Sequence, residues 1–192
     1  MGRTIFRYDF NSPFAYLAAQ RVDAVLGPDV EWQPIAFAFL LRAQQRVPWS
    51  FDERRPPGVA EIARRAAGRG LPPVVYPEGW PRESYTLDPL RVAWAAAGHG
   101  LLREYSHAAF RRNFVDGTGL KDGAALEVAA DLGLDAAAVR TAMDGPAKER
   151  LRAATDEAIA VGVPGVPTVT VDGEHFWGDD RLEDAAAATM ST

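Results

Sequence analysis

Two short segments, one near each end of the chain, carry residues whose types and spacing could do chemistry. Ser12 and Pro13 stand between an alternating segment and a run of residues with helical spacing. Serine is a preferred N-cap residue and proline suits the first helical position, so a helix is predicted to begin here. A hydroxyl at a helix start can also donate to an anion, beside unpaired backbone N–H groups that add positive potential. Ser12 is therefore either a plain N-cap or an anion-stabilising donor.

The second segment is Val166 and Pro167, at the start of the alternating run 168–171. An apolar residue before a proline that opens a strand favours a cis peptide bond. The reason is that proline cannot donate to a sheet ladder and adopts the cis form at low cost. Taken alone, this pattern indicates the buried start of an edge strand.

Composition limits the classes of function. The chain of 192 residues has no cysteine, which excludes disulfides, thiolate metal sites and Cys-x-x-Cys redox chemistry by the chain itself. A net charge of −5 without a basic tract argues against nucleic acid as the main partner. No charged-then-apolar signal segment opens the sequence, and no apolar run approaches the ~18 residues of a membrane span. We therefore expect a cytoplasmic protein with no membrane partner.

The chain begins with a β–α–β pattern. Residues 4–10 alternate and contain aromatic and β-branched side chains, which predicts a strand. A helix is predicted from Pro13, with Gly27-Pro28 as its end. Residues 30–35 are the second predicted strand, and the short crossover helix favours a parallel pair.

Helical spacing dominates from about residue 37 to residue 160. The predicted helices span residues 59–67, 88–98, 101–115, 122–132, 135–143 and 147–161. The proline-rich stretch 71–81 is predicted to be a loop, and Gly98-His99-Gly100 is predicted to turn the chain between two helices. Paired arginines such as Arg64-Arg65 are typical of solvated helix faces.

The end of the chain predicts a hairpin and a helix. Asp172-Gly173 is a turn signal between the predicted strands 167–171 and 174–177. A final helix is predicted over 179–188. The whole order is β-α-β, a helical block, and then α-β-β-α.

Three segments, in this order and spacing, resemble one group of proteins. They are Tyr8-Asp9-Phe10-Asn11-Ser12-Pro13-Phe14-Ala15-Tyr16-Leu17, Gly162-Val163-Pro164-Gly165-Val166-Pro167-Thr168 and Phe176-Trp177-Gly178-Asp179-Asp180-Arg181-Leu182. The chain resembles the DsbA-like superfamily and, within it, the family of 2-hydroxychromene-2-carboxylate isomerases and kappa-class glutathione transferases. The resemblance implies an α/β, thioredoxin-like (DsbA-like) fold of residues 1–36 and 155–192 with an inserted α-helical domain of residues 37–154.

The resemblance also implies roles for individual residues. Ser12 is expected to activate the sulfur of glutathione, and the backbone of Val166 is expected to grip the cysteinyl part of that peptide. Asp180 matches the family's aspartate at the γ-glutamyl end, whereas Asp179 stands where a serine or another residue often lies. The residues expected to bind the thiol are Ser12, Pro13, Val166, Pro167, Asp179, Asp180 and Arg181.

The segment after the second strand departs from the family's pattern. Isomerases of the family typically carry an Asn-x-Pro-Pro segment there, whose asparagine helps to position the substrate, and this chain has no asparagine in that segment. Gln45 or Arg46 could replace it. Aromatic side chains of this region could line a substrate pocket or simply fill the core. The candidate pocket residues are Phe14, Gln45, Arg46, Trp49 and Tyr85.

These observations predict a thiol-dependent isomerase of a small aromatic substrate, with glutathione or another low-molecular-weight thiol as cofactor. By family analogy we expect a homodimer. Two alternatives stay open, namely a kappa-class-like glutathione transferase or peroxidase, and a non-catalytic thiol- or peptide-binding protein. No metal site is predicted, because His99, His107 and His175 lack partner ligands at suitable spacing.

Overall fold

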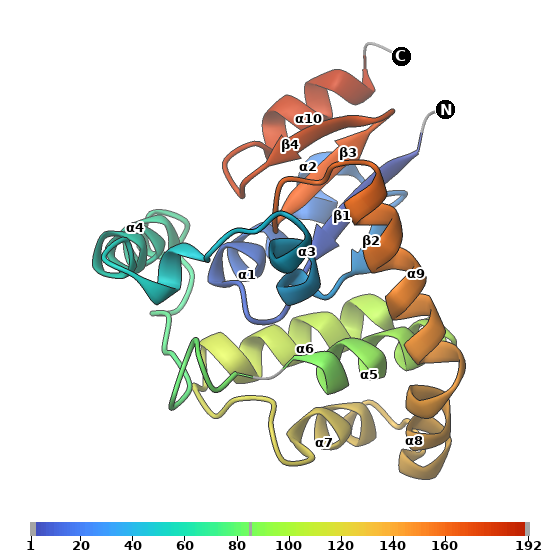
Figure 1. The fold of residues 1–192 in the computed structure, drawn as a ribbon. Coiled ribbons are helices and arrows are strands. Elements are labelled where there is room, and N and C mark those ends of the chain that lie inside the picture. Colours follow the sequence, from blue (N-terminus) through green and yellow to red (C-terminus); the bar gives the residue numbers. More distant parts are fainter. Residues whose placement is uncertain (1–2, 85, 191–192) are drawn as a thin grey trace.

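The computed structural model describes residues 3–84 and 86–190, which form an α/β fold around a four-stranded sheet (Figure 1). The strands are β1 Thr4–Tyr8, β2 Glu31–Pro34, β3 Thr168–Val171 and β4 Glu174–Trp177, in the order β2-β1-β3-β4. β1 pairs in parallel with β2 and antiparallel with β3, and β3 pairs antiparallel with β4. The predicted parallel pair and the predicted hairpin are therefore confirmed. β3 is an inner strand, so the interpretation of Val166-Pro167 as the start of an edge strand was wrong.

The helices fill most of the rest of the described chain. They are α1 Pro13–Ala19, α2 Val22–Leu26, α3 Phe37–Ala43, the short 3-10 helix η1 Trp49–Phe51, α4 Arg55–Gly68, α5 Leu87–Ala97, α6 Leu102–Phe114, α7 Ala124–Asp131, α8 Ala136–Asp144, α9 Pro146–Ala160 and α10 Leu182–Thr189. Residues 98–100 turn the chain between α5 and α6, as predicted. Among the described residues, no helix is long and apolar enough to cross a bilayer.

One face of the sheet is apolar because side chains alternate along each strand. Phe6 and Tyr8 of β1 are fully buried there and stack at 5.2 Å between ring centroids. The Trp32 ring of β2 meets both of them edge-on. These rings belong to a hydrophobic core that continues into α1, α5 and α6, so the sheet and the helical block share one core.

The other face of the sheet is polar. The buried Arg7 of β1 donates to Gln33 Oε1 at 2.6 Å and to Thr170 Oγ1 at 2.7 Å. Gln33 donates in turn to Glu157 of α9 at 3.0 Å. α9 therefore covers this face, and Figure 1 shows it running beside the sheet.

The first predicted helix is broken in two. α1 ends at Ala19 and α2 begins at Val22, because Arg21 between them leaves helical geometry at φ −131°. The Arg21 guanidinium donates to the Asp179 carbonyl at 3.4 Å and pairs with the Glu183 carboxylate of α10. The side chain at this break therefore contacts residues at the other end of the chain.

The last helix begins at Leu182 and not at residue 179, so that prediction was wrong at its first turn. Gly178 adopts a φ of +124°, and Asp179 and Asp180 lie in the turn that follows it. The Asp179 carboxylate forms ion pairs with α4, which hold this residue outside the helix.

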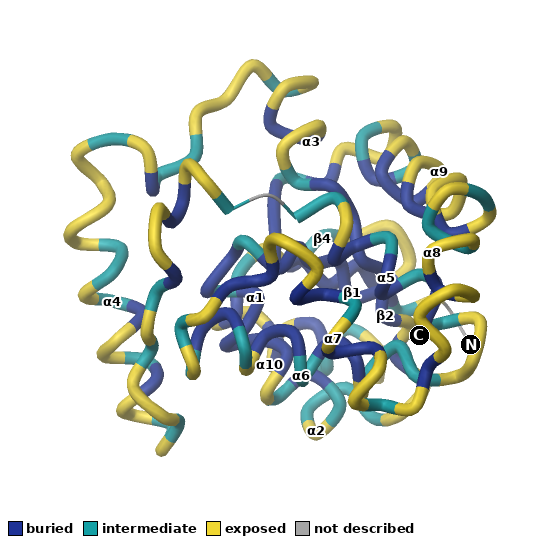
Figure 2. The backbone as a smooth tube through the Cα atoms, turned by 90° about the horizontal axis from the view of Figure 1, so that it is seen from below, coloured by how far each residue is buried: buried dark blue, intermediate teal, exposed yellow. Residues whose placement is uncertain are grey.

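α4 lies to one side of the molecule, where it contacts α1 and η1 (Figure 1). Ile62 and Ala66 are its buried residues, and Figure 2 shows the rest of the helix as exposed or intermediate. The predicted domain boundaries after residues 36 and 154 stay a prediction. α9 runs without a break across the second of them.

Candidate functional site

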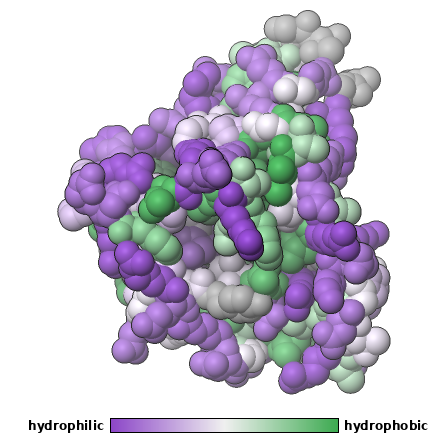
Figure 3. Space-filling view, in the orientation of Figure 1, coloured by the Kyte–Doolittle hydropathy of each residue, from purple (hydrophilic) through white to green (hydrophobic). Residues whose placement is uncertain are grey.

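A cleft of about 880 Å³ opens where three parts of the chain meet. These parts are the start of α1, the segment from α3 to α4, and the turns beside β3 and β4. On the face shown in Figure 3, hydrophobic residues gather near the centre within a hydrophilic surround. The cleft brings together the predicted residues Ser12, Pro13, Phe14, Arg46, Trp49, Val166, Pro167, Asp179 and Asp180.

Ser12 lies in the wall of the cleft and is 8% exposed. It is the N-cap of α1, and its hydroxyl oxygen accepts the Ala15 N–H at 3.2 Å. The same hydroxyl donates to the Val166 carbonyl across a long distance of 3.5 Å. Because a hydroxyl has two lone pairs and one proton, capping the helix leaves that proton available to another acceptor. The two readings of Ser12 are therefore compatible.

The loop before β3 forms the wall next to Ser12. The Val166–Pro167 peptide bond is cis, and within the described chain the Val166 N–H makes no hydrogen bond. The Pro167 carbonyl accepts the Gly178 N–H at 3.0 Å, which ties this loop to the turn after β4. The loop thus presents one backbone donor and one backbone acceptor, both on Val166, at the edge of the cleft.

Trp177 of β4 supports this loop from the side. A Cβ atom on Gly165 would lie only 2.8 Å from Trp177 Nε1, so the indole packs directly against the backbone. The Arg46 guanidinium stands 5.1 Å from the Trp177 ring centroid and donates to the Pro164 carbonyl. Glycine at position 165 is therefore required by packing, and Arg46 links the end of α3 to the loop.

Asp9 is a buried carboxyl that joins two parts of the cleft. Its Oδ1 accepts the Asn11 N–H and its Oδ2 accepts the Phe37 N–H, both at 2.9 Å. It thereby fixes the loop before Ser12 to the first residue of α3. Burial raises the pKa of Asp9 above its usual range, and the two backbone hydrogen bonds oppose this only in part.

Asp179 forms the end of the cleft nearest to α4. The side chain is 1% exposed, and its oxygens lie 2.6 Å from Arg65 Nη1 and 2.5 Å from Arg69 Nη1. Asp180 is more exposed and lies 3.1 Å from Arg65 Nη2. Burial lowers the pKa of Arg65, but the hydrogen bond to Glu61 and the charges of both aspartates outweigh it and raise that pKa above its ordinary value. The interpretation of Arg65 as a solvated residue was therefore wrong.

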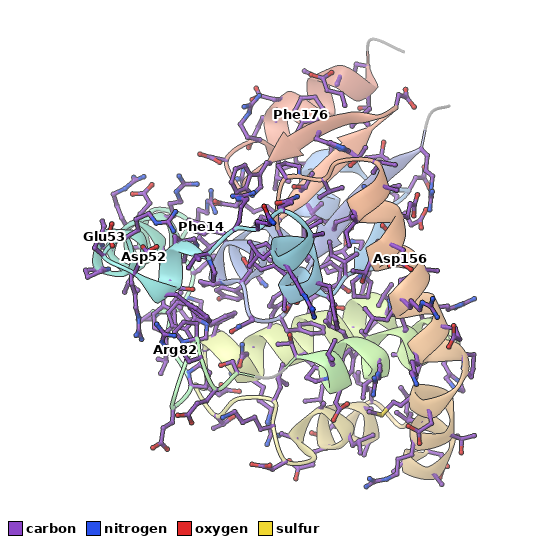
Figure 4. The ribbon with its side chains drawn as sticks, in the orientation of Figure 1. Phe14, Asp52, Glu53, Arg82, Asp156 and Phe176 are labelled. Carbon is purple, nitrogen blue, oxygen red and sulfur yellow. The ribbon has the colours of Figure 1, made fainter. Side chains whose placement is uncertain are left out.

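Aromatic rings form the remaining wall. The Phe14 and Trp49 rings meet at 5.7 Å between centroids, and Trp49 and Trp80 meet at 6.0 Å. In Figure 4, Phe14 lies between α1 and the α4 region. Trp80 is 4% exposed and donates its indole N–H to the Asn11 carbonyl at 3.2 Å. The predicted pocket residues Phe14 and Trp49 are thus in direct contact.

Among the described residues, two predicted ones are not among those that line the cleft. Gln45 is exposed, with a φ of +54° just after α3, and Arg181 pairs with Asp184 on the surface. The chain reverses direction after α3, and this turn carries Gln45 away from the cleft. Tyr85 lies outside the described residues, so its prediction is untested.

Sequence reasoning missed several residues of the site. Asp9 and Trp177 stood in the resembling segments but received no role, and Arg65 was assigned to solvent. The position of Asp9 just before the Ser12 segment was a usable signal, whereas the pairing of Arg65 with Asp179 leaves no local trace. Among the described residues, no group of histidine, aspartate and glutamate could hold a metal ion.

The chain is similar in sequence and in structure to several known proteins. A 2-hydroxychromene-2-carboxylate isomerase from Sphingobium xenophagum is 31% identical over 95% of this chain and 96% of its own length. The solved structure of a 2-hydroxychromene-2-carboxylate isomerase has a TM-score of 0.83 at 26% identity, over 98% of this chain and 94% of that one. The cytosolic disulfide reductase DsbM from Pseudomonas aeruginosa, solved with GSH, has a TM-score of 0.64 at 18% identity, over 99% of this chain and 100% of that one.

The family comparison covers nearly the whole chain. The DsbA-like thioredoxin domain matches residues 4–189, which include both halves of the sheet and all the helices between them. The chain therefore belongs to the DsbA-like thioredoxin domain family.

Proposed function

We propose that this protein is a thiol-dependent isomerase of a small aromatic substrate, similar to 2-hydroxychromene-2-carboxylate isomerase. The observation that carries the proposal is the position of the Ser12 hydroxyl beside the Val166 backbone, in a cleft with an aromatic wall. Because the chain has no cysteine, the sulfur must come from a bound thiol. The isomerase relative at 31% identity supports this class of reaction.

The residues of the cleft fit glutathione or another small thiol. Val166 offers an unpaired N–H and a carbonyl that is held only by a long hydrogen bond, which suits pairing with an extended peptide. Asp180, whose side chain is more than half exposed, offers a carboxylate to an ammonium group. A cleft of about 880 Å³ has room for both a thiol and a substrate. The DsbM structure with GSH shows that a protein of this fold can hold glutathione.

When bound, the thiol would supply a nucleophilic sulfur that adds to the substrate and leaves unchanged, so that no atom or electron is gained overall. Ser12 would turn its proton from the Val166 carbonyl toward that sulfur. Lowering a thiol pKa by ~2 units requires about 2.7 kcal/mol, and one hydrogen bond to a charged group supplies ~1.5–3 kcal/mol. Ser12 can therefore supply most of the activation while it still caps α1.

The aromatic wall would hold the substrate ring. Phe14, Trp49 and Trp80 are rigid side chains that contact one another, so they can stack on a planar ring at little entropic cost. They also exclude water from the Ser12 end of the cleft, which strengthens the hydrogen bond to a charged acceptor there.

A single experiment tests the proposed function. Native mass spectrometry with glutathione and other small thiols identifies which of them binds, and conversion of 2-hydroxychromene-2-carboxylate is then followed with and without that thiol. We expect thiol binding and turnover that requires the thiol. A stable thiol–substrate adduct as the product would instead indicate a transferase. Binding without turnover would indicate a non-catalytic protein, and turnover without thiol would contradict the proposal.

A further inference from the structure

The segment that forms one wall of the cleft has a charge opposite to that of the whole protein. Residues 37–70, which include α3, η1 and α4, contain seven arginines and three acidic residues, whereas the net charge of the chain is −5. A wall of one charge sign concentrates ligands of the other sign near it. The positive wall therefore favours ligands that carry negative charge.

Four arginines of this segment line the cleft, and three of them are engaged by the protein. Arg46 bonds the Pro164 carbonyl and stacks on Trp177. Arg54 pairs with Asp52 and bonds the Val47 carbonyl at 3.1 Å. Arg65 pairs with Glu61 and with both aspartates of the turn after β4.

Arg42 differs from these three. Within the part of the chain that the structure describes, its side chain makes no hydrogen bond, ion pair or ring contact. The helix that carries it is firmly placed, because the adjacent Leu40 and Leu41 are buried and Asp9 accepts the first N–H of α3. Arg42 is thus a guanidinium on a fixed helix at the cleft, with its donors free for a ligand.

The surroundings of Arg42 define the ligand. Phe37, Phe39 and Leu41 of the same helix also line the cleft, so an occupant that reaches Arg42 should pair an apolar body with one anionic group. A guanidinium matches a carboxylate because it can donate two parallel hydrogen bonds. Building on the proposed function, we propose that Arg42 binds the carboxylate of the aromatic substrate and so makes the cleft selective for anionic electrophiles.

The test compares two electrophiles that differ in one charge. An aryl-substituted unsaturated keto acid and its methyl ester are assayed with wild-type protein, Arg42→Gln and Arg42→Lys. Losing a hydrogen bond between charged groups should lower kcat/KM for the acid about 10- to 100-fold, mainly through KM. The kcat/KM for the ester should change by less than about threefold, because the ester offers no anion to the guanidinium. Arg42→Lys should recover part of the loss, since it keeps the charge without the paired donors.

Arg64→Gln is the matched control. It removes the same charge from the same segment, but its side chain is 71% exposed and pairs with Glu61 away from the cleft. If Arg64→Gln and Arg42→Gln lowered kcat/KM for the acid equally, only the general charge of the segment would matter, and the proposal would be overturned. A cation in the last turn of α3 can also act on the helix dipole alone. In that case Arg42→Gln would slightly lower the free energy of unfolding and leave kcat/KM unchanged for both the acid and the ester, which also contradicts the proposal.

A measurement of substrate affinity tests the role of Arg42 independently of the proposed function, because binding does not require turnover. Quenching of the cleft tryptophans by the keto acid reports its affinity even if the protein does not convert it. Weaker binding of the acid to Arg42→Gln, with ester binding unchanged, supports the role of Arg42 whether or not turnover occurs. Equal binding of the acid to both proteins overturns it, even if thiol-dependent turnover is observed.

Discussion

The two walls of the cleft are built in different ways. The wall around Ser12 and Val166 lies at the ends of β1 and β3, is nearly buried, and offers backbone groups and one hydroxyl. The wall made by α3, η1 and α4 is largely exposed and offers arginine side chains, most of them held by ion pairs. The backbone groups and hydroxyl of the first wall can make the same hydrogen bonds with any peptide-like thiol. The arginine side chains of the second wall are suited to recognising a particular substrate.

With the proposed function, this difference would let one fold keep its thiol and change its substrate. The positions of Ser12 and Val166 follow from strand pairing, so they are hard to alter without loss of the sheet. An arginine of this wall that makes no buried ion pair, such as Arg42, can be exchanged with little effect on the core, because that segment buries few residues. We therefore expect substitutions in the first wall to change thiol chemistry, and substitutions in the second to change substrate choice.

The ion pairs of Asp179 are where the two walls are joined, and breaking them should have the largest effect. Asp179→Ala leaves Arg65 and Arg69 without their shared buried carboxylate. Breaking a buried pair of this kind costs about 3–5 kcal/mol, which chemical denaturation should detect as a loss of unfolding free energy. Asp180→Ala, at the more exposed partner of Arg65, should cost much less. An equal loss of unfolding free energy in both variants would show that Asp179 does not hold α4 in place.

Gly165 tests the first wall through packing. A Cβ atom at this position would overlap the Trp177 indole, so Gly165→Ala should lower the unfolding free energy by about 1–3 kcal/mol. Because the loop must shift, affinity for the bound thiol should also fall. Gly68→Ala is the control, since a Cβ there meets nothing within 4 Å. Wild-type affinity in Gly165→Ala, measured by calorimetry, would exclude this loop from thiol binding.

Substitution of Asp9 should have the smallest effect of the three, and this effect should appear in how the free energy of unfolding depends on pH. Its raised pKa means that the folded state binds a proton more tightly than the unfolded state does. Stability from this group therefore falls as pH rises above about 3.9, the ordinary value for aspartate, toward the folded pKa. Asp9→Asn removes the titrating carboxyl and with it this pH dependence. The variant should therefore gain stability relative to wild type between pH 4 and pH 7. Urea denaturation at both pH values checks this, and a constant difference would contradict it.

Much of the fold was predictable because its signals are local. The alternation of residues 4–10, the Asp172-Gly173 turn and the short crossover were enough to give the parallel β1–β2 pair and the β3–β4 hairpin. The antiparallel pairing of β1 with β3, which joins them into one sheet, was implied by the family resemblance. Ser12 and Pro167 were placed by the same local chemistry of caps and strand starts. The role of a thiol, in contrast, came from the family resemblance and not from spacing.

The rest of the site depends on partners that are distant in sequence. Arg21, at the break between α1 and α2, contacts Asp179 and Glu183, which lie at the other end of the chain. The buried carboxylate of Asp179 is paired with Arg65 of α4 and with Arg69, the residue that follows this helix. Gln45 was placed in the pocket by analogy to a missing asparagine, but the turn after α3 leaves it exposed. No periodicity or motif records contacts of this kind.

The central claim is that Ser12 stabilises the thiolate of the bound cofactor, and a titration of bound glutathione tests it most directly. The thiolate is followed by its ultraviolet absorbance as pH is raised, in wild-type protein, Ser12→Ala and Ser12→Thr. Loss of one hydrogen bond to a charged sulfur, ~1.5–3 kcal/mol, should raise the apparent thiol pKa in Ser12→Ala by roughly 1–2 units and lower turnover accordingly. Ser12→Thr, which keeps a hydroxyl, should stay closer to wild type. An unmoved titration in Ser12→Ala, with only the loss of about 1 kcal/mol of stability expected for a missing N-cap, would show that Ser12 is structural.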